Sequence, residues 1–164
     1  MIIRRTVMGE LDEVCGIYAA AREFMRHNGN TKQWINGHPS REAVTRDIEA
    51  GRSYVCINDD EIAAVFYYCI EPEPTYAKID GHWLCDEPYG VIHRIARSRS
   101  DAGNGAGEHC LNWCYEQCRN LRIDTHSDNA PMKKLLGRLG FAYCGIIWIE
   151  NGDERMAYQK RDKV

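Results

Sequence analysis

Three alternating glycines are the residues in this 164-residue chain whose spacing most clearly points to chemistry. Gly103, Gly105 and Gly107 follow an apolar, β-branched segment, residues 91–96, and precede a segment with helical spacing. Glycines let main-chain N–H groups approach an anion without an intervening Cβ atom, and a helix N-terminus adds unpaired donors and a favourable dipole. The pattern predicts a cradle for a phosphorylated ligand, with a flexible surface loop as the alternative.

The glycine spacing excludes two common nucleotide loops. A Walker A loop has Lys and then Ser or Thr after its last glycine, whereas Glu108 and His109 follow Gly107. In the dinucleotide fingerprint G-x-G-x-x-G, the third glycine would fall on Glu108 or on Cys110. These residues alone therefore leave the identity of the phosphorylated ligand open.

Eight cysteines raise the question of a thiol or metal site. They form no C-x-x-C pair and no zinc-finger spacing. Cys110, Cys114 and Cys118 recur every four residues, which places them on one face of a helix. A metal site could use such a row, but we favour a core-facing stripe of reduced thiols and expect no metal.

Length and composition limit the class of protein. The chain, at 18.8 kDa, has the size of one domain, residues 1–164. A formal net charge of −3 and a pI near 6.1 give no overall basic surface for nucleic acid. The N-terminal segment lacks the apolar core of a signal peptide, and no stretch approaches the ~20 apolar residues of a membrane span. We expect a cytoplasmic protein without nucleic-acid or membrane partners.

Strands and helices are predicted on both sides of the glycines. Helical spacing covers residues 11–26, a segment from the potential N-cap Ser40 to near Gly51, the segment after the glycines, and residues 130–139. Strands are predicted over residues 2–4, 53–58, 61–70, 91–96, 121–125, 141–150 and 155–159. The strand–helix–strand order around the glycines implies one parallel pair inside an otherwise antiparallel sheet.

Two motifs together resemble the GNAT N-acetyltransferase superfamily, and the likeness covers nearly the whole chain. The family's pyrophosphate loop, Arg/Gln-x-x-Gly-x-Gly/Ala, falls on residues 102–107. In the family an asparagine also opens a later helix that closes on Gly-Phe, and Asn129, Gly140 and Phe141 match those places. The resemblance implies a mixed α/β fold, with a mostly antiparallel sheet of roughly six to seven strands, one parallel splayed pair and about four flanking helices.

The resemblance also implies an N-acetyltransferase that moves an acetyl group from acetyl-CoA to a primary amine by direct attack in a ternary complex. The acceptor would be a small-molecule amine or a peptide amine, and the enzyme a monomer or homodimer. Acetyl-CoA would lie in a V-shaped split between the strands that end near Arg97 and Thr125. The implied cofactor contacts are main-chain groups of Ile95, Ala96 and Arg97, the N–H groups of Gly103, Asn104, Gly105, Ala106, Gly107 and Glu108, and the side chains of Asn129 and of Lys133 or Lys134.

One departure from the family pattern affects the pyrophosphate loop. Ala102 stands at its first position, so the usual Arg or Gln side chain is missing and we expect weaker cofactor affinity. Glu108 suits the helix dipole but adds negative charge near the phosphates. We expect Arg97 or Arg99 to compensate.

Two further departures remove the family's usual proton-transfer residues. Leu136 stands where most members carry the tyrosine that protonates the thiolate. Val91 stands where some members carry a glutamate base, and valine cannot titrate. The nearby replacements for the tyrosine are Tyr143, Tyr158 and Cys144.

His93 is the base that we favour. Strand alternation predicts that it shares a face with Val91 and Ile95, and the ordinary pKa of a histidine, about 6.5, suits proton abstraction near neutral pH. A hydrogen-bonded structural histidine is the alternative. Arg94 is predicted on the opposite face, in a structural ion pair with Asp124. Weaker base candidates are His126, Glu71 and Glu73.

The acceptor pocket in this family usually lies among the first two helices, their connection and the loop before the cofactor strand. The corresponding residues are Phe24, Trp34, Asp80, His82, Trp83 and Tyr89. This mixture of aromatic and acidic groups would suit a cationic amine. Two alternatives stay open: a catalytically degenerate acyl-CoA-binding sensor, motivated by the missing tyrosine and glutamate, and a thiol- or metal-binding protein.

Overall fold

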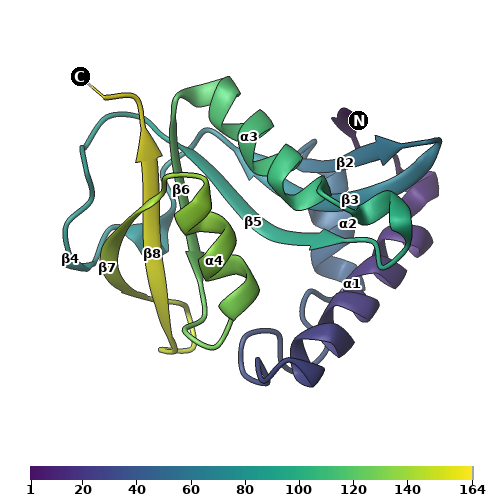
Figure 1. Ribbon diagram of the computed structural model, residues 1–164. Helices are drawn as coiled ribbons and strands as arrows, with labels where there is room; N and C mark the ends of the chain where they lie inside the picture. The colour runs from purple at the N-terminus through teal and green to yellow at the C-terminus, as the bar shows by residue number, and fades with distance from the viewer. Residues whose placement is uncertain (164) are drawn as a thin grey trace.

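A single mixed sheet of eight strands forms the centre of the molecule, as a computed structural model that describes residues 1–163 shows (Figure 1). The strand order is β1-β2-β3-β5-β6-β8-β7-β4. The strands are β1 (Ile2–Arg5), β2 (Ser53–Asn58), β3 (Glu61–Cys69), β4 (Asp80–Gly81), β5 (Gly90–Arg97), β6 (Asn120–Thr125), β7 (Ala142–Trp148) and β8 (Glu154–Arg161). The expected mixed sheet with one parallel pair is confirmed. The two-residue β4, at the edge beside β7, exceeds the predicted number of strands.

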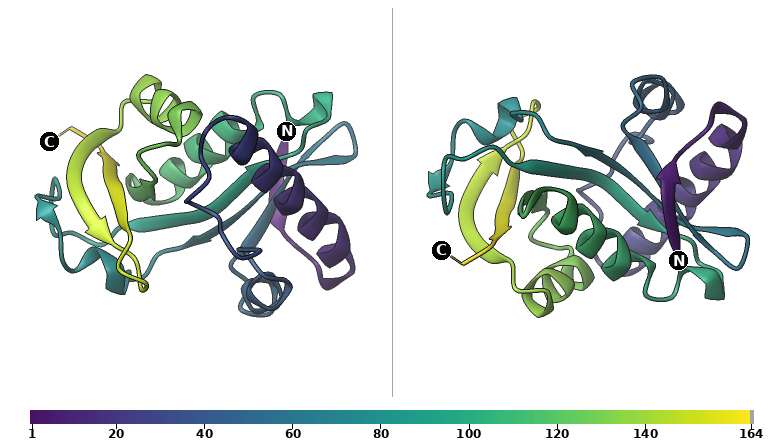
Figure 2. Two further views of the ribbon diagram at one scale, coloured as in Figure 1. Left: turned by 90° about the horizontal axis from the view of Figure 1, so that it is seen from below. Right: turned by 90° about the horizontal axis from the view of Figure 1, so that it is seen from above.

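Four α-helices cover the two faces of the sheet, with α1 and α2 on one face and α3 and α4 on the other (Figure 2). They are α1 (Leu11–His27), α2 (Arg41–Glu49), α3 (Ala106–Cys118) and α4 (Ala130–Arg138), and short 3-10 turns form η1 (Met8–Glu10), η2 (Pro74–Tyr76) and η3 (Asp101–Gly103). Ser40 caps α2 as predicted, since its Oγ accepts a hydrogen bond of 3.1 Å from the Ala43 N–H. None of the helices in residues 1–163 combines the length and the apolar character needed to cross a bilayer.

Side chains that alternate along β2 and β3 separate two cores. Cys56 and Phe66 face α3 and α4, whereas Val55 and Val65 face α1 and α2. A third, smaller cluster places Tyr76, Val91, Ile147 and Ala157 beneath η2. The α1–α2 core and the η2 cluster leave space between them, and the candidate site lies there.

The cysteine row on α3 belongs to the core. Cys110 and Cys114 are fully buried, and burial raises the pKa of the Cys114 thiol. Cys118 is half-buried, and its Sγ donates to the main-chain O of Cys114. Across the described part of the chain, no three His, Cys, Asp or Glu side chains converge as metal ligands would. The four-residue spacing of these cysteines therefore reflects helix packing.

A β-bulge in β5 changes the direction of its side chains. The pairing of β3 with β5 shifts register between Val65 and Tyr67, and Arg94 takes a left-handed conformation with φ 49°. His93 and Arg94 consequently both lie against Tyr67, with 5.7 Å between the His93 and Tyr67 ring centroids and 4.7 Å from the guanidinium carbon to the Tyr67 ring. Ile95 packs against the α3 core instead. The prediction that His93 shares a face with Ile95 and opposes Arg94 is wrong, because the bulge interrupts strand alternation.

The parallel strands β5 and β6 separate after a short paired stretch. They pair only at Gly90 with Leu121 and at Val91 with Arg122. Beyond this point β5 stays paired to β3 and β6 stays paired to β8, so the two strands diverge (Figure 1). We call this opening the β5–β6 split; it occurs where the sequence predicts it.

Candidate active site

The glycine loop, residues 101–107, leads from β5 into α3. Glycine is required at two of its positions, for a different structural reason at each. A Cβ atom on Gly103 would lie 2.1 Å from the main-chain O of Ser98, far closer than van der Waals contact permits. Gly105 is the N-cap of α3 with φ 74°, a left-handed conformation that costs glycine little. These two glycines therefore determine how the main chain enters α3.

The main-chain donors of this loop are fewer than the sequence predicts. The N–H groups of Gly103 and Asn104 donate to Ser100 O and Asp101 O, each at 3.0 Å, inside the η3 turn. In the region described, the N–H groups of Gly105, Ala106, Gly107 and Glu108 are at the open N-terminus of α3, without an acceptor in the turn. The prediction that Gly103 and Asn104 offer free N–H donors is wrong, because the turn already uses them.

Arg138 on α4 compensates the charge of Glu108. It forms an ion pair with the Glu108 carboxylate from the neighbouring helix. Arg99 instead stacks on the ring of Phe24, with 3.9 Å from its guanidinium carbon to the ring centroid, and Arg97 donates to main chain. The expectation that Arg97 or Arg99 compensates Glu108 is wrong, because Arg138 does so. Phe24, which was expected to bind the acceptor, lies under Arg99.

Asn129 connects the start of α4 to the segment between α1 and α2. Its Oδ1 caps α4 by accepting a main-chain hydrogen bond, and its Nδ2 donates to Gln33 Oε1 at 3.0 Å. Gln33 is a contact that the sequence analysis did not anticipate. Lys133 donates to the main-chain O of Ser127, whereas Lys134 is exposed on α4.

A cavity of about 710 Å³, here called the central cavity, lies between the α1–α2 connection and η2. Its floor is formed by β5, β6 and the start of β8, and it reaches into the β5–β6 split, where Ile95 and Asn129 line it. Its lining includes many charged or titratable side chains, among them Glu73, His93, Asp124 and Arg155, which come from separate elements. The volume is within the range of small-molecule sites.

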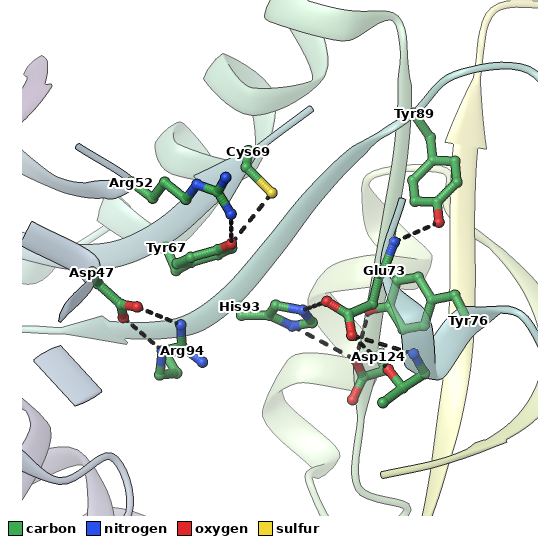
Figure 3. A network of polar contacts seen from close by, with 11 residues as sticks. Asp47, Arg52, Tyr67, Cys69, Glu73, Tyr76, Tyr89, His93, Arg94 and Asp124 are labelled. Carbon is green, nitrogen blue, oxygen red and sulfur yellow. Dashed lines mark hydrogen bonds and ion pairs between the residues drawn. The ribbon is translucent and has the colours of Figure 1, made fainter. Parts of the chain in front are cut away.

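His93 and Glu73 form the closest pair of titratable groups in this cavity (Figure 3). His93 Nε2 lies 3.0 Å from Glu73 Oε2, and the other carboxylate oxygen accepts from the N–H and the hydroxyl of Thr75. Tyr89 holds the Glu73 backbone, since its hydroxyl oxygen accepts from the Glu73 N–H at 2.9 Å. The hydrogen bond from His93 lowers the pKa of Glu73 to about 2, against a smaller opposing effect of burial.

These contacts determine which nitrogen of His93 is free to act as a base. Because Glu73 is ionised and can only accept, Nε2 carries a hydrogen, so the neutral form of the ring has its lone pair on Nδ1. Nδ1 lies 3.8 Å from Asp124 Oδ2, and that oxygen accepts from the Tyr76 hydroxyl at 2.6 Å. Burial and the Asp124 charge raise the pKa of Tyr76 well above its ordinary value, so its hydroxyl remains a donor. The arrangement can take a proton at Nδ1 and stabilise the resulting imidazolium.

Arg94 pairs with Asp47 on α2, and not with Asp124 as the sequence analysis expects. Its Nε and Nη2 donate to the two Asp47 oxygens, each at 2.9 Å, in a bidentate pair (Figure 3). The predicted pair is wrong because the bulge turns Arg94 toward α2. Asp124 is thereby left to face His93.

Among the four aromatic residues predicted to bind the acceptor, Trp34 lines the central cavity, where it makes an edge contact with Tyr18. Trp83 and Tyr89 instead enclose the Arg122 guanidinium, at 4.2 and 3.8 Å from their ring centroids. Both lie outside the cavity lining. Tyr89 nevertheless acts on the site through its hydrogen bond to Glu73.

The remaining predicted residues lie away from the cavity. Tyr143 and Tyr158 form an edge-on ring pair on β7 and β8, with centroids 5.7 Å apart, and neither lines the cavity. Burial raises the pKa of Tyr158. Asp80 belongs to the edge strand β4, and His82 follows it with a main-chain bond to β7. The structure therefore brings His93 and Trp34 to one cavity and leaves the two tyrosines apart from it.

Sequence reasoning missed or undervalued several groups of this site. Asp47, Tyr76 and Arg155 carry no local signal, because each meets the site only through the sheet and its covering helices. Glu73 did have one: it precedes Pro74 and caps η2 through a bond to the Thr75 N–H. A Glu before Pro in a turn can be recognised as a fixed carboxylate.

Comparison with known protein families finds one match over most of the chain. Residues 17–141 match the model of the Acetyltransferase (GNAT) family. A protein named uncharacterized N-acetyltransferase YesJ, from Bacillus subtilis (strain 168), is 27% identical over 150 residues, which cover 85% of this chain and 80% of the relative.

Solved structures agree with this match. A GNAT-family acetyltransferase from Streptococcus agalactiae 2603 is 32% identical with a TM-score of 0.89, covering 99% of this chain and 96% of that one. Another GNAT-family acetyltransferase, from Listeria monocytogenes 4b F2365, has a TM-score of 0.72 at 18% identity, covering 97% and 93% of the two chains. The second likeness supports the fold alone.

Proposed function

Because the chain belongs to the GNAT acetyltransferase family, we propose that it transfers an acetyl group from acetyl-CoA to a primary amine by direct attack in a ternary complex. The observation that carries this proposal is the position of the Glu73–His93 pair on the wall of a cavity that opens into the β5–β6 split. Acetyl-CoA, when bound, supplies the acetyl group as a thioester that an amine can attack. The proposed base, His93, and the proposed acetyl-CoA site thus lie along the same strand, β5.

The residues of the β5–β6 split fit such a donor. Beyond Val91 the β6-facing edge of β5 lacks a strand partner within the described residues, so main-chain groups at Ile95–Arg97 are available to an extended amide-containing arm. The open N-terminus of α3, from Gly105 to Glu108, offers N–H groups and a positive dipole end to a pyrophosphate. Gly103, where a Cβ would strike Ser98, allows the loop to turn into α3. Asn129 and Lys134 complete the set of proposed contacts.

His93 is proposed to accept the proton that the amine nitrogen loses on attack. Its Nδ1 carries the lone pair, and ionised Glu73 on Nε2 stabilises the imidazolium that forms. Asp124, 3.8 Å from Nδ1, adds negative charge beside the incoming amine, and Tyr76 holds the Asp124 carboxylate in place. The side chains thus orient the acceptor and hold the transferred proton.

A thiol-release assay tests this function directly. Purified protein is incubated with acetyl-CoA and a panel of amines, and acetyl-CoA binding is measured separately by calorimetry. We expect binding in every case and thiol release only when a suitable amine is present. Tight binding without thiol release for any amine would overturn the enzyme proposal and favour a catalytically inactive acyl-CoA sensor.

A further inference from the structure

Arg155 is a buried cation on the wall of the central cavity that pairs with no carboxylate. The residue is 5% exposed and lines the cavity from the start of β8. Its Nη1 donates to Glu154 O at 2.9 Å and its Nη2 to Gln33 O at 3.3 Å, both main-chain oxygens. Over residues 1–163 it takes part in no ion pair. A guanidinium has five N–H donors, so donors remain for a ligand.

Arg94, an arginine on β5 that also lines this cavity, has the close counter-charge that Arg155 lacks. Arg94 has both oxygens of Asp47 as partners, each at 2.9 Å. Asp124 and Asp153 act on Arg155 from a distance, but burial is the larger influence and lowers its pKa. A buried charge without a close counter-charge is costly, and an anionic ligand would remove that cost.

The register of the sheet places this cation beside the reacting groups. Asp124 on β6 pairs with Ala157 on β8, and Arg155 lies two residues earlier on the same face as Ala157. Asp124 in turn lies 3.8 Å from His93 Nδ1. Asp124 is therefore a neighbour of both the base, His93, and the Arg155 guanidinium.

We propose that Arg155 binds a carboxylate of the acceptor, which makes the acceptor a small molecule that carries both a primary amine and a carboxylate. This inference rests on the proposed acetyl transfer. The planar guanidinium matches a carboxylate with two parallel hydrogen bonds, while Asp124 and Glu73 attract the amine at the other end. Acidic and basic side chains balance in the cavity lining, since Glu150 and Asp153 are matched by Lys32 and Arg46. This balance favours a ligand that carries one negative and one positive group over a doubly charged phosphate.

Matched acceptors test the inference on the wild-type protein. For several side chains, kcat/KM is measured by thiol release with an amino acid, its carboxamide and its decarboxylated amine. We expect the amino acid to exceed the other two by about 30-fold or more, the loss typical of removing one partner of a buried charge pair. Equal or better turnover of the decarboxylated amines would overturn the inference while leaving acetyl transfer intact. Absence of thiol release with every acceptor would overturn the proposed function itself.

Variants of Arg155 connect the preference to this side chain. In Arg155→Gln the preference for the amino acid should disappear, mainly through KM, while turnover of the decarboxylated amine changes little. Arg155→Lys should keep part of the preference, because an ammonium retains charge but lacks the two-pronged geometry. Arg161→Gln removes the same charge from the same strand, where it pairs with Glu87, and should leave the preference unchanged. An equal fall for all three acceptors in Arg155→Gln would indicate a structural role and overturn the assignment.

Folding of the variants is checked by thermal unfolding and by acetyl-CoA binding. Both should match the wild type if Arg155 serves the acceptor alone. If Arg155→Gln does not fold, Arg155→Lys and the wild-type ratio of amino acid to carboxamide decide the question, since the carboxamide has nearly the shape of the carboxylate and lacks its charge.

Discussion

The β5–β6 split and the central cavity meet along β5, yet different parts of the chain supply their contact groups. The split consists of unpaired strand edges, a glycine loop and a helix N-terminus, so main-chain atoms predominate. The cavity carries charged side chains from η2, β5, β6 and β8: Glu73, His93, Asp124 and Arg155. Under the proposed function, substitutions in the cavity would change the acceptor chemistry without altering the donor site. This is a physical reason why one fold can serve many acceptors.

Replacing His93 should separate the two regions most strongly. We expect His93→Ala to lower kcat by about 10²–10⁴-fold, because the amine loses its proton acceptor, while the Kd for acetyl-CoA stays unchanged. Thiol release and calorimetry measure the two quantities. His27→Ala, at the exposed end of α1, is the matched control and should leave both unchanged. Full activity of His93→Ala would show that His93 is not the general base.

Asp47 supports the cavity from outside its lining. Asp47→Asn should lower the free energy of unfolding by about 2–4 kcal/mol, because the Arg94 guanidinium loses a bidentate counter-charge at a largely buried position. Urea unfolding measures the change. Asp12→Asn breaks an exposed pair with Arg41 and should cost less than about 1 kcal/mol. If both variants lose the same stability, Arg94 depends little on its counter-charge.

The glycine loop should respond to volume rather than charge. Gly103→Ala should destabilise the loop by about 1–3 kcal/mol and weaken acetyl-CoA binding, because its Cβ would meet Ser98 O at 2.1 Å. Gly16→Ala on α1, away from the loop, is the control, since its Cβ would meet no atom within 4 Å. Calorimetric titration with acetyl-CoA compares the two variants. Equal affinities would show that the path of the loop at Gly103 does not control the donor site.

The split is built mainly from one continuous stretch of chain, whereas the cavity is built from distant segments. This difference explains how far each region can be predicted from the sequence. The split follows from local features: the glycine spacing, the strand before it and the helix after it lie within one stretch of chain, and the structure confirms the diverging parallel pair there. Even here, the sequence does not reveal that the N–H groups of Gly103 and Asn104 are already hydrogen-bonded. They donate to main-chain oxygens inside the 3-10 turn η3, so they are not free for a ligand.

The cavity could be predicted only in part, since its groups meet through tertiary structure. His93 was recognisable as a titratable residue in the cofactor strand, but its partner Glu73 lies 20 residues away, across a turn. The bulge at Arg94 carries no glycine and no proline, so strand alternation gave the wrong face and the wrong ion-pair partner. Arg155 and Asp124 become neighbours only through the register between β6 and β8.

A change in acid stability tests whether Glu73 is held as an ionised partner of His93. The pKa of Glu73 is about 2 in the folded protein, below its ordinary 4.5, so between these values the unfolded chain binds more protons. The stability that this carboxylate contributes is complete above about pH 4.5 and is lost as the pH falls toward 2.

In Glu73→Gln that contribution is absent, so the variant should be less stable than the wild type at neutral pH, and the gap should close on acidification. Urea unfolding from pH 7 to 2.5 measures the gap, with Glu116→Gln on the exposed surface of α3 as control for loss of one carboxylate. A gap that stays constant with pH would mean that His93 does not hold Glu73 in its ionised form, and Nδ1 would lose its assignment as the free base.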